Sequence, residues 1–300
     1  MTTFVDGPVE VTVPATAANL GPGYDALGVA LGLRDRLVGR VTDGVTVVEV
    51  SGEGAADVPR DEAHLVVRAM LLAFDQMGQR PPGIRLSCEN AIPHARGLGS
   101  SAAAVAGGIA LARGLVAGGT LLLDDDAAFR LAAALEGHPD NVAPAWYGGF
   151  VVSGLGDDGG FWAVPASLDP RVSAVAFVPP TRVATAEARR LLPASVPHAD
   201  AAANAGRAAL LVAALAGRPE HLHLATHDLL HQQYRRPAMP ASLELVEALR
   251  ARGLAAVVSG AGPTVLALCA DGEVEALLAT TPDGWQGRHL ALDPKGVRVG

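Results

Sequence analysis

Two glycines and two serines lie close together in the segment PHARGLGSSAA, residues 93–103. Gly97 and Gly99 can adopt positive φ angles, and they carry no Cβ that would keep a ligand away from the backbone. The alanine-rich run that follows predicts a helix, and the N–H groups at a helix N-terminus attract anions. The hydroxyl of Ser100 or Ser101 could bind Mg²⁺. The segment favours a phosphate site, although a glycine turn that lets a helix cross a sheet tightly has the same composition.

Two familiar phosphate loops can be tested on this segment. A Walker loop needs a lysine before its serine or threonine, and the only lysine in the chain is Lys295, which excludes that loop. The run from Gly97 to Ala102 does fit the dinucleotide pattern G-x-G-x-x-A, and TLLLD, ending at Asp124, could supply the second strand with its ribose-binding acid. Against this, seven residues that include a proline separate the preceding strand from the glycines. An NAD-dependent oxidoreductase stays an alternative.

Composition limits the class of protein. Half of the 300 residues are hydrophobic, and 23 basic against 31 acidic side chains give a net charge of −8 with no long basic block. We therefore expect a globular protein that binds neither nucleic acid nor an anionic membrane. The first residues, MTTFVDGPVE, lack the basic end and apolar run of a signal peptide, so a cytoplasmic location is expected. Cys88 and Cys269 lie in apolar runs and are expected to be buried thiols.

The pattern of apolar residues predicts a strand-rich first part. Strands are expected at 9–13, 45–50 and 84–89, and a helix is expected after Asp61, ending at Gly78. The helix at 101–115 is almost entirely apolar, which predicts burial on most sides. DDDAAFRLAAALEG predicts a further helix with acidic residues at its positive end. We place a first domain at 1–160.

The second part, 161–300, predicts an antiparallel sheet with helices. The apolar runs SAVAFVP, LAAVVSG and TVLALCA indicate strands, the last two joined by the turn AGP. Helices are expected near 185–193, 199–217 and 241–251. The fold class is therefore α+β.

Four segments in order resemble the GHMP kinases, the family of galactokinase, homoserine kinase and mevalonate kinase. They are the glycine loop already quoted, PATAANLGPGYD at 14–25, EGHPDNVAPAWYGG at 136–149 and SGAGPT at 259–264. The resemblance implies a two-domain fold, with an N-terminal domain like domain 2 of ribosomal protein S5 and a ferredoxin-like C-terminal domain. The segments at 14–25 and 136–149 are similar to those of homoserine kinases. They imply ATP-dependent phosphorylation of L-homoserine to O-phospho-L-homoserine, a step toward threonine; mevalonate- and shikimate-type kinases are alternatives. A homodimer is expected only by analogy.

The resemblance assigns the nucleotide and metal sites to particular residues. Mg²⁺ is expected between Ser101, or Ser100, and Glu136, since a hard cation favours oxygen ligands. ATP is expected on the whole loop: Pro93, His94, Ala95, Arg96, Gly97, Leu98, Gly99, Ser100, Ser101, Ala102 and Ala103.

The acceptor is a small zwitterion, whose carboxylate suits a planar arginine fork. Arg189 and Arg235 match the expected positions in TAEAR and QYR. Asp25, Asp140 and Arg189 are the predicted catalytic residues, and whether a base removes the hydroxyl proton stays open because a loose transition state makes little demand on one. The predicted acceptor-binding residues are Asn19, Asp25, His138, Asn141, Thr185, Arg189, Arg235 and Gly260.

Two histidine features stand apart from these assignments. His64 occupies a position near the adenine and ribose where many relatives have asparagine. His223, His227 and His231 recur at four-residue intervals, with His221 nearby. Without a cysteine or an H-E-x-x-H pattern beside them, we interpret them as exposed helix residues and not as a zinc site.

Overall fold

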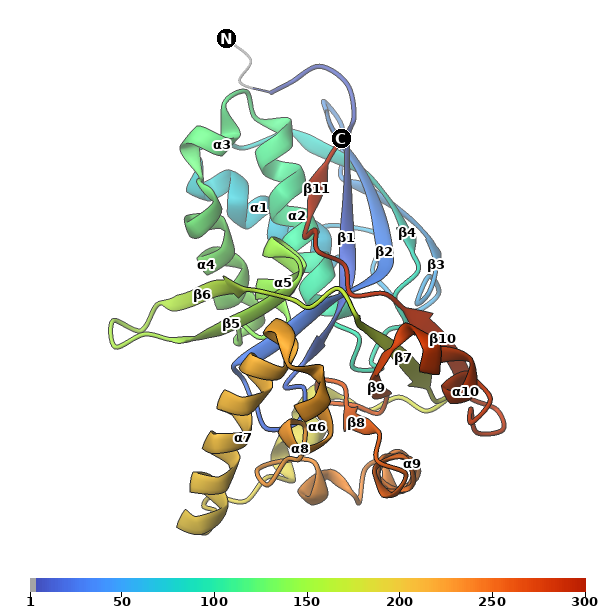
Figure 1. The fold of residues 1–300 in the computed structure, drawn as a ribbon. Helices are drawn as coiled ribbons and strands as arrows, with labels where there is room; N and C mark the ends of the chain where they lie inside the picture. The colour runs from blue at the N-terminus through green and yellow to red at the C-terminus, as the bar shows by residue number, and fades with distance from the viewer. Residues whose placement is uncertain (1–3) are drawn as a thin grey trace.

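A seven-stranded sheet forms the upper part of the molecule in the computed structural model, which describes residues 4–300 (Figure 1). Five strands follow the order β11-β1-β2-β4-β3, while β5 pairs with β2 and with β6. The pairing of β3 with β4 is parallel and the others are antiparallel. The strands are β1 Val9–Ala18, β2 Leu27–Thr42, β3 Val47–Gly52, β4 Gly83–Asn90, β5 Phe150–Leu155, β6 Phe161–Ala166 and β11 Arg298–Val299.

A group of helices packs beside this sheet, with α2 at its centre (Figure 1). A Cβ added to Gly107 would lie 2.4 Å from Cδ1 of Leu37, and one added to Gly108 would lie 2.5 Å from the carbonyl oxygen of Val66. The small residues of α2 therefore let its backbone approach both β2 and α1 closely. The helices are α1 Leu65–Gln76, α2 Ser100–Leu115, α3 Gly119–Leu122, α4 Asp125–Glu136 and α5 Val142–Tyr147.

A second, four-stranded antiparallel sheet lies in the lower part, in the order β10-β7-β9-β8. Part of its apolar surface forms a separate core with α9 and α10. The strands are β7 Val172–Val178, β8 Ala255–Val258, β9 Val265–Ala270 and β10 Gln286–Leu290. The helices are α6 Thr185–Arg190, α7 His198–Gly217, α8 Leu222–Ala225, α9 Pro240–Ala251 and α10 Val274–Leu278, with 3₁₀ turns at Pro219–His221, Gln233–Arg235 and Asp271–Glu273.

The long helix α7 closes the lower left of the molecule (Figure 1). Its length and composition alone would let it cross a membrane. In the fold, its buried Asn204 donates a hydrogen bond to the carbonyl of Pro22 at 2.8 Å and accepts one from the N–H of Leu229 at 3.1 Å. The first bond ties α7 to the loop between β1 and β2, and the second ties it to the segment after α8.

The α+β class and most elements agree with the sequence predictions, and the exceptions have physical reasons. The long strand β2 was not predicted, because the charged residues 34–36 interrupt its apolar pattern. TLLLD does not form a strand: residues 119–122 form α3, and Asp124 caps α4 by accepting a hydrogen bond from the N–H of Ala127 at 2.8 Å. The proposed second strand of a dinucleotide fold is therefore wrong.

The chain changes sheet between Ala166 and Val172, and β11 returns to the first sheet near the C-terminus. By strand pairing, 161–166 and 298–299 thus join the first sheet. The division of the chain at residue 160 stays a prediction.

Candidate active site

The glycine loop between β4 and α2 presents backbone N–H groups that are free to bind a ligand. Neighbouring groups take its carbonyl oxygens: Thr264 N–H bonds to Arg96 O at 3.3 Å, Ser259 Oγ to Gly97 O at 2.7 Å, and Thr16 N–H to Leu98 O at 3.0 Å. Within residues 4–300, none of the N–H groups of 97–101 donates a hydrogen bond. Five consecutive donors at the N-terminus of a 16-residue helix form an anion site.

The loop needs glycine at two positions for different contacts. Gly97 has a φ of 74°, and a Cβ there would lie 2.2 Å from the carbonyl oxygen of Ser259 in the turn between β8 and β9. Gly99 has a φ of 71°, and a Cβ there would lie 1.9 Å from Oγ1 of Thr16 on β1. The glycines therefore let the loop lie close to two other segments.

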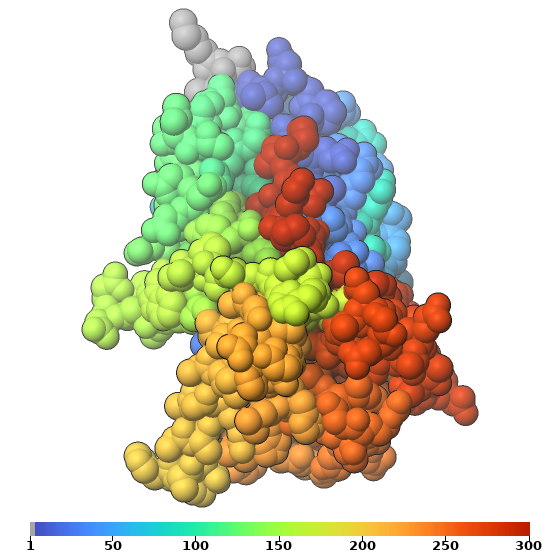
Figure 2. Space-filling view, viewed as in Figure 1, coloured from blue at the N-terminus to red at the C-terminus, as the bar shows by residue number. Residues whose placement is uncertain are grey.

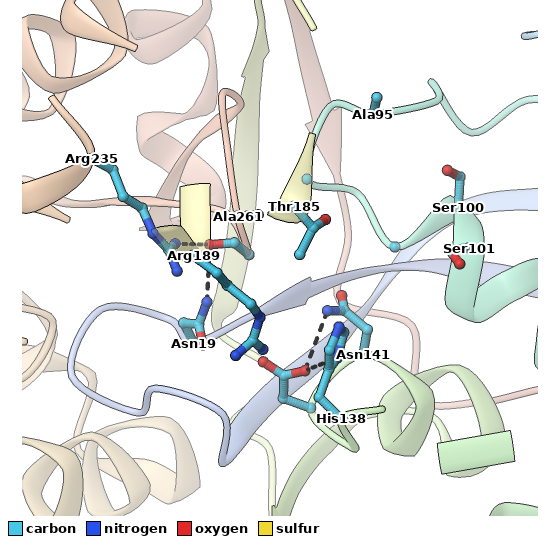
Figure 3. A pocket seen from close by; sticks show the side chains of 14 residues that line it. Asn19, Ala95, Ser100, Ser101, His138, Asn141, Thr185, Arg189, Arg235 and Ala261 are labelled. Carbon is cyan, nitrogen blue, oxygen red and sulfur yellow. Dashed lines mark hydrogen bonds and ion pairs between the residues drawn. The ribbon is translucent and has the colours of Figure 1, made fainter. Parts of the chain in front are cut away.

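A cavity of about 110 Å³ is lined on one side by Gly97, Gly99, Ser100 and Ser101 of this loop. Figure 3 shows Ser100 and Ser101 on one side of it and Asn19, Arg189 and Arg235 on the opposite side. The structure thus separates a phosphate side from a side rich in charged and amide groups. The lining residues are Asn19, Ala95, Gly97, Gly99, Ser100, Ser101, His138, Asp140, Asn141, Thr185, Arg189, Arg235, Gly260 and Ala261.

Ser101 and Glu136 meet at the phosphate side. The hydroxyl of Ser101 donates to Oε2 of Glu136 at 2.7 Å, which joins the start of α2 to the end of α4. Burial raises the pKa of Glu136, against a smaller opposite effect of the Ser101 hydrogen bond. A hydroxyl and a carboxylate fit a hard cation that takes its other ligands from phosphate and water. No cluster of three or more His, Cys, Asp or Glu side chains competes for a cation among the residues described.

The two arginines differ in what they bind. The guanidinium of Arg189 pairs with both carboxylate oxygens of Asp25, at 2.6 and 3.0 Å, and donates to the hydroxyl of Tyr24 at 2.9 Å. The hydrogen bonding that Arg189 donates to Asp25 is the main cause that raises the pKa of Arg189.

Arg235, only 1% exposed, donates through one terminal nitrogen to the carbonyl of Gly260 at 2.8 Å. Its Nε is buried, and no described residue offers it an acceptor. Burial lowers the pKa of Arg235. A buried guanidinium with an unused edge is a receptor for a carboxylate.

Asn19 and Tyr24 hold this side of the cavity in place. The amide of Asn19 donates to the same Gly260 carbonyl at 2.9 Å, and its oxygen accepts from the N–H of Asp25 at 2.9 Å. The Tyr24 ring lies 5.6 and 5.7 Å from the guanidinium carbons of Arg189 and Arg235, within the range of cation–π attraction.

The loop between α4 and α5 brings His138, Asp140 and Asn141 to the cavity. Nδ1 of His138 is hydrogen-bonded to Oδ1 of Asp140 at 2.9 Å, and Asp140 is 2% exposed. Burial lowers the pKa of His138, but the hydrogen bond and charge of Asp140 outweigh it and raise the pKa overall. Oδ1 of Asn141 accepts from the hydroxyl of Thr16 at 2.8 Å.

A second cavity, of about 280 Å³, adjoins the first at the N-terminus of α2, since Ser100 and Ser101 line both. Its apolar wall includes Leu37, Pro59 and Ala104, a surface suited to a flat ring. Its polar groups are Asp35, His64, Asn90 and His94. Burial lowers the pKa of both His64 and His94, which favours neutral rings able to donate and accept.

The remaining loop residues have other roles. Pro93, Leu98 and Ala102 are buried, while His94 and Ala103 line the second cavity. The guanidinium of Arg96 is turned away from both cavities, because it donates to the carbonyls of His94, Pro179 and Pro180 at 2.8 to 3.0 Å. Arg96 therefore fastens the loop to the segment after β7.

Several contributors were not predicted. No spacing in the sequence identified these lining or supporting residues in advance. They are Thr16, Tyr24, Ala261 and most residues of the second cavity. The prediction that the recurrent histidines are all exposed is wrong for His231, whose side chain is fully buried. It is hydrogen-bonded to the carbonyl of Gly21 at 2.8 Å, and its ring centre lies 5.2 Å from that of Tyr24 with the two planes tilted by 38°.

Known proteins are similar to this chain in sequence and in fold. The model of the GHMP kinases N terminal domain matches residues 64–149, and that of the GHMP kinases C terminal domain matches residues 209–280. The chain is 52% identical over 291 residues to the homoserine kinase of Streptomyces avermitilis, covering 97% of this chain and 95% of that protein. It is 50% identical over 300 residues to the homoserine kinase of Clavibacter michiganensis, covering 97% and 93%. The crystal structure of homoserine kinase from Cytophaga hutchinsonii superimposes with a TM-score of 0.84 at 24% identity, covering 100% of this chain and 99% of that chain. The chain therefore belongs to the GHMP kinase family, among its homoserine kinases.

Proposed function

We propose that this chain transfers the γ-phosphoryl group of ATP to the hydroxyl of L-homoserine in the cytoplasm, on the route to threonine. The observation that carries the proposal lies in one cavity, lined by four loop residues with unbonded N–H groups and by a buried arginine whose Nε has no acceptor among the described residues. The loop residues are Gly97, Gly99, Ser100 and Ser101. The first feature fits a polyphosphate and the second fits the carboxylate of an amino acid.

ATP would lie across both cavities. Its phosphates would accept hydrogen bonds from the N–H groups of 97–101, at the positive end of α2. Its base and ribose would enter the second cavity, where the neutral rings of His64 and His94 and the amide of Asn90 offer hydrogen bonds. His64 is 5% exposed and its Nδ1 has no partner among the described residues, so it is a candidate contact for the base.

L-Homoserine would bind on the side opposite the serines. Its carboxylate would meet Arg235, with Arg189 beside it, and Thr185 could add a hydroxyl contact. Its ammonium group would bind the carboxylate of Asp25, because the carbonyl of Gly260 already accepts hydrogen bonds from Asn19 and Arg235. The same carboxylate holds Arg189 at 2.6 Å and therefore fixes both charged ends of the substrate relative to each other.

In the transfer step, the homoserine hydroxyl oxygen forms a bond to the γ-phosphorus. The bond from that phosphorus to the bridging oxygen breaks, and ADP leaves with the electron pair. The hydroxyl proton must also leave. Asp140 is buried at the cavity wall and its Oδ2 has no partner among the described residues, so we assign the proton to this carboxylate.

Mg²⁺ held by Ser101 and Glu136 would neutralise charge on the phosphate oxygens during transfer. Both residues supply the oxygen ligands that this cation prefers, and their 2.7 Å contact supports the proposal by placing the two ligands beside each other.

An ADP-release assay on a panel of acceptors tests the proposal. We expect the highest kcat/KM for L-homoserine, with L-threonine, L-serine, mevalonate and galactose at least about tenfold lower, since these lose or misplace a polar contact. Mevalonate has a carboxylate but no ammonium group, so equal rates with it would contradict the assigned role of Asp25. Galactose has neither charge, so equal rates with it would contradict the assigned role of the arginines. No ADP release with any acceptor would remove the kinase assignment itself.

A further inference from the structure

A third cavity, of about 380 Å³, lies at the opposite end of the helices that form the active site. It is bounded by the last turns of α2 and α5, the start of α4 and the C-terminal segment. In Figure 2 the red C-terminal segment lies directly against the green helices on this face. The lining residues are Ala110, Arg113, Gly114, Thr120, Asp125, Trp146, Tyr147, Gly296, Val297 and Val299.

Arg113 is the polar centre of this third cavity. Its side chain is 9% exposed, and one terminal nitrogen donates to Oδ1 of Asp125 at 2.8 Å. Its Nε is buried without an acceptor, and its other terminal nitrogen bonds to no group in residues 4–300. The guanidinium carbon lies 5.4 Å from the ring centre of Trp146. Burying a charged group without full hydrogen bonding is costly, which indicates a site kept for a carboxylate.

The surroundings of Arg113 do not favour a simple anion. Asp125 has a side chain 74% exposed at the same opening, and Asp124 and Asp126 flank it. Burial, followed by the charges of Asp126 and Asp125, raises the pKa of Tyr147 to about 12. The aromatic faces of Trp146 and Tyr147 add to this environment, because they attract cations. One positive group facing several negative and aromatic groups complements a molecule that carries both charges.

Three helices link the third cavity to the active site. Each helix has one end at the third cavity and the other end at the active site. α2 runs from Ser101 to Arg113, and α4 runs from Asp125 to Glu136. The two are antiparallel, tied by the Ser101–Glu136 bond at one end and the Arg113–Asp125 pair at the other. α5 begins after Asn141 and ends at Trp146 and Tyr147.

We propose that the third cavity is an effector site for a small aliphatic α-amino acid, separate from the acceptor cavity. The carboxylate binds Arg113, the ammonium group binds Asp125 and the aromatic faces, and the apolar side chain packs on Ala110, Val297 and Val299. Binding shifts the far ends of α2 and α4 and so changes the affinity for ATP. The inference does not depend on which acceptor the enzyme phosphorylates.

The fluorescence of Trp146 can report binding in the third cavity. The chain has three tryptophans, at 146, 162 and 285, so Trp162→Phe with Trp285→Phe leaves only the one in the third cavity. We use L-valine as the probe, with isobutylamine and isovalerate as analogues that each lack one charge. Arg235→Leu is added in a parallel series to weaken any binding of L-valine in the acceptor cavity.

We expect a saturable fluorescence change with L-valine near about 1 mM, a typical weak metabolite affinity. The analogues should produce no such change, and the signal should persist with Arg235→Leu. Asp125→Asn and Arg113→Met should each weaken binding at least about tenfold, through loss of a charge-assisted hydrogen bond. The matched control is Asp75→Asn, because that exposed carboxylate in α1 pairs with Arg80 at 2.9 Å and does not line the third cavity. Saturating L-valine should change the Kd for ATP at least about fivefold.

Absence of a saturable change, or an equal response to either analogue, would overturn the site. Unchanged binding of L-valine in both Asp125→Asn and Arg113→Met would also overturn the site. Because Asp125 is mostly exposed, its variant can report binding even if the arginine variant fails to fold. Binding that leaves the Kd for ATP unchanged would overturn the effector role. A chain that binds L-valine here but does not phosphorylate homoserine would separate this inference from the proposed function.

Discussion

Replacing Arg235 by leucine should separate acceptor binding from folding. The guanidinium is 1% exposed, its Nε has no acceptor, and burial lowers its pKa. Its only hydrogen bond among the described residues goes to the carbonyl of Gly260, which also accepts from Asn19 at 2.9 Å. Leucine would therefore leave that carbonyl satisfied and would remove a buried charge. We expect the melting temperature of Arg235→Leu to stay the same or rise.

The loss should appear in acceptor affinity instead. A charge-assisted hydrogen bond contributes about 1.5 to 3 kcal/mol, and Arg235 can offer two to a carboxylate. Since Arg189 remains, we take about 3 kcal/mol, which corresponds to roughly a 100-fold rise in the KM for homoserine. The KM for ATP should change less than about threefold, because the phosphate side is untouched.

Steady-state ADP release with each substrate varied in turn measures both constants. Arg236→Leu is the matched control, since this neighbouring arginine is more exposed and pairs with Glu247 at the surface. Equal rises in both KM values would remove Arg235 from the acceptor site. A fall in melting temperature well beyond that of the control would show that Arg235 stabilises the fold, contrary to this reasoning.

Three further changes test other parts of the site. Glu136→Gln should lower kcat by about 100-fold or more and raise the Mg²⁺ concentration needed for half-maximal rate, because an amide is a weaker ligand for a hard cation; an unchanged Mg²⁺ dependence would contradict the assigned pair with Ser101. Asp35 is 6% exposed, and burial raises its pKa from 3.8 to about 6, so the folded state binds its proton more tightly than the unfolded state. The resulting penalty is absent below pH 3.8 and complete above about pH 6, and it amounts to about 3 kcal/mol at about 1.4 kcal/mol per pKa unit. Asp35→Asn should therefore be more stable to urea than the parent chain at pH 7 but equal at pH 3.5, and a gain of the same size at both pH values would exclude titration of Asp35 as the cause. Gly99→Ala should abolish ATP binding measured by calorimetry, since its Cβ would lie 1.9 Å from Oγ1 of Thr16, whereas retained affinity would show that the loop can move away from β1.

Sequence alone predicted a phosphate loop because the chemistry of such a loop is local. Gly97 and Gly99 are adjacent to the helix start that they serve, so their spacing already describes the site. The helices were predicted for the same reason, as α4 shows, because Asp124 and Gly137 mark its two ends within one short stretch. In the structure, Asp124 caps the N-terminus of α4, and Gly137 has a φ of 86° at its C-terminus.

Contacts between distant segments were less accessible. Asp35 interrupts the apolar pattern of β2, yet its side chain is buried. Its carboxylate can be buried because it accepts hydrogen bonds from the N–H groups of Ala91 and Ile92, at 2.7 and 2.9 Å, more than fifty residues later in the chain. His231 has the same spacing as its exposed neighbours, and only the position of Tyr24 in the folded chain explains its burial. The placement of Arg235 came from family resemblance, because nothing in its local sequence distinguishes it from Arg236.

In the proposed phosphate loop, the hydrogen-bond donors to phosphate are main-chain N–H groups. Every residue except proline carries the same N–H group, so substitution of side chains at positions such as 98 or 100 would leave those donors in place. Alanine scanning of this segment would thus underestimate its importance. Proline at Ser100, the first residue of α2, would delete one donor without disturbing the helix. Proline at Gly97 or Gly99 is unsuitable for this purpose, because it cannot adopt their positive φ angles.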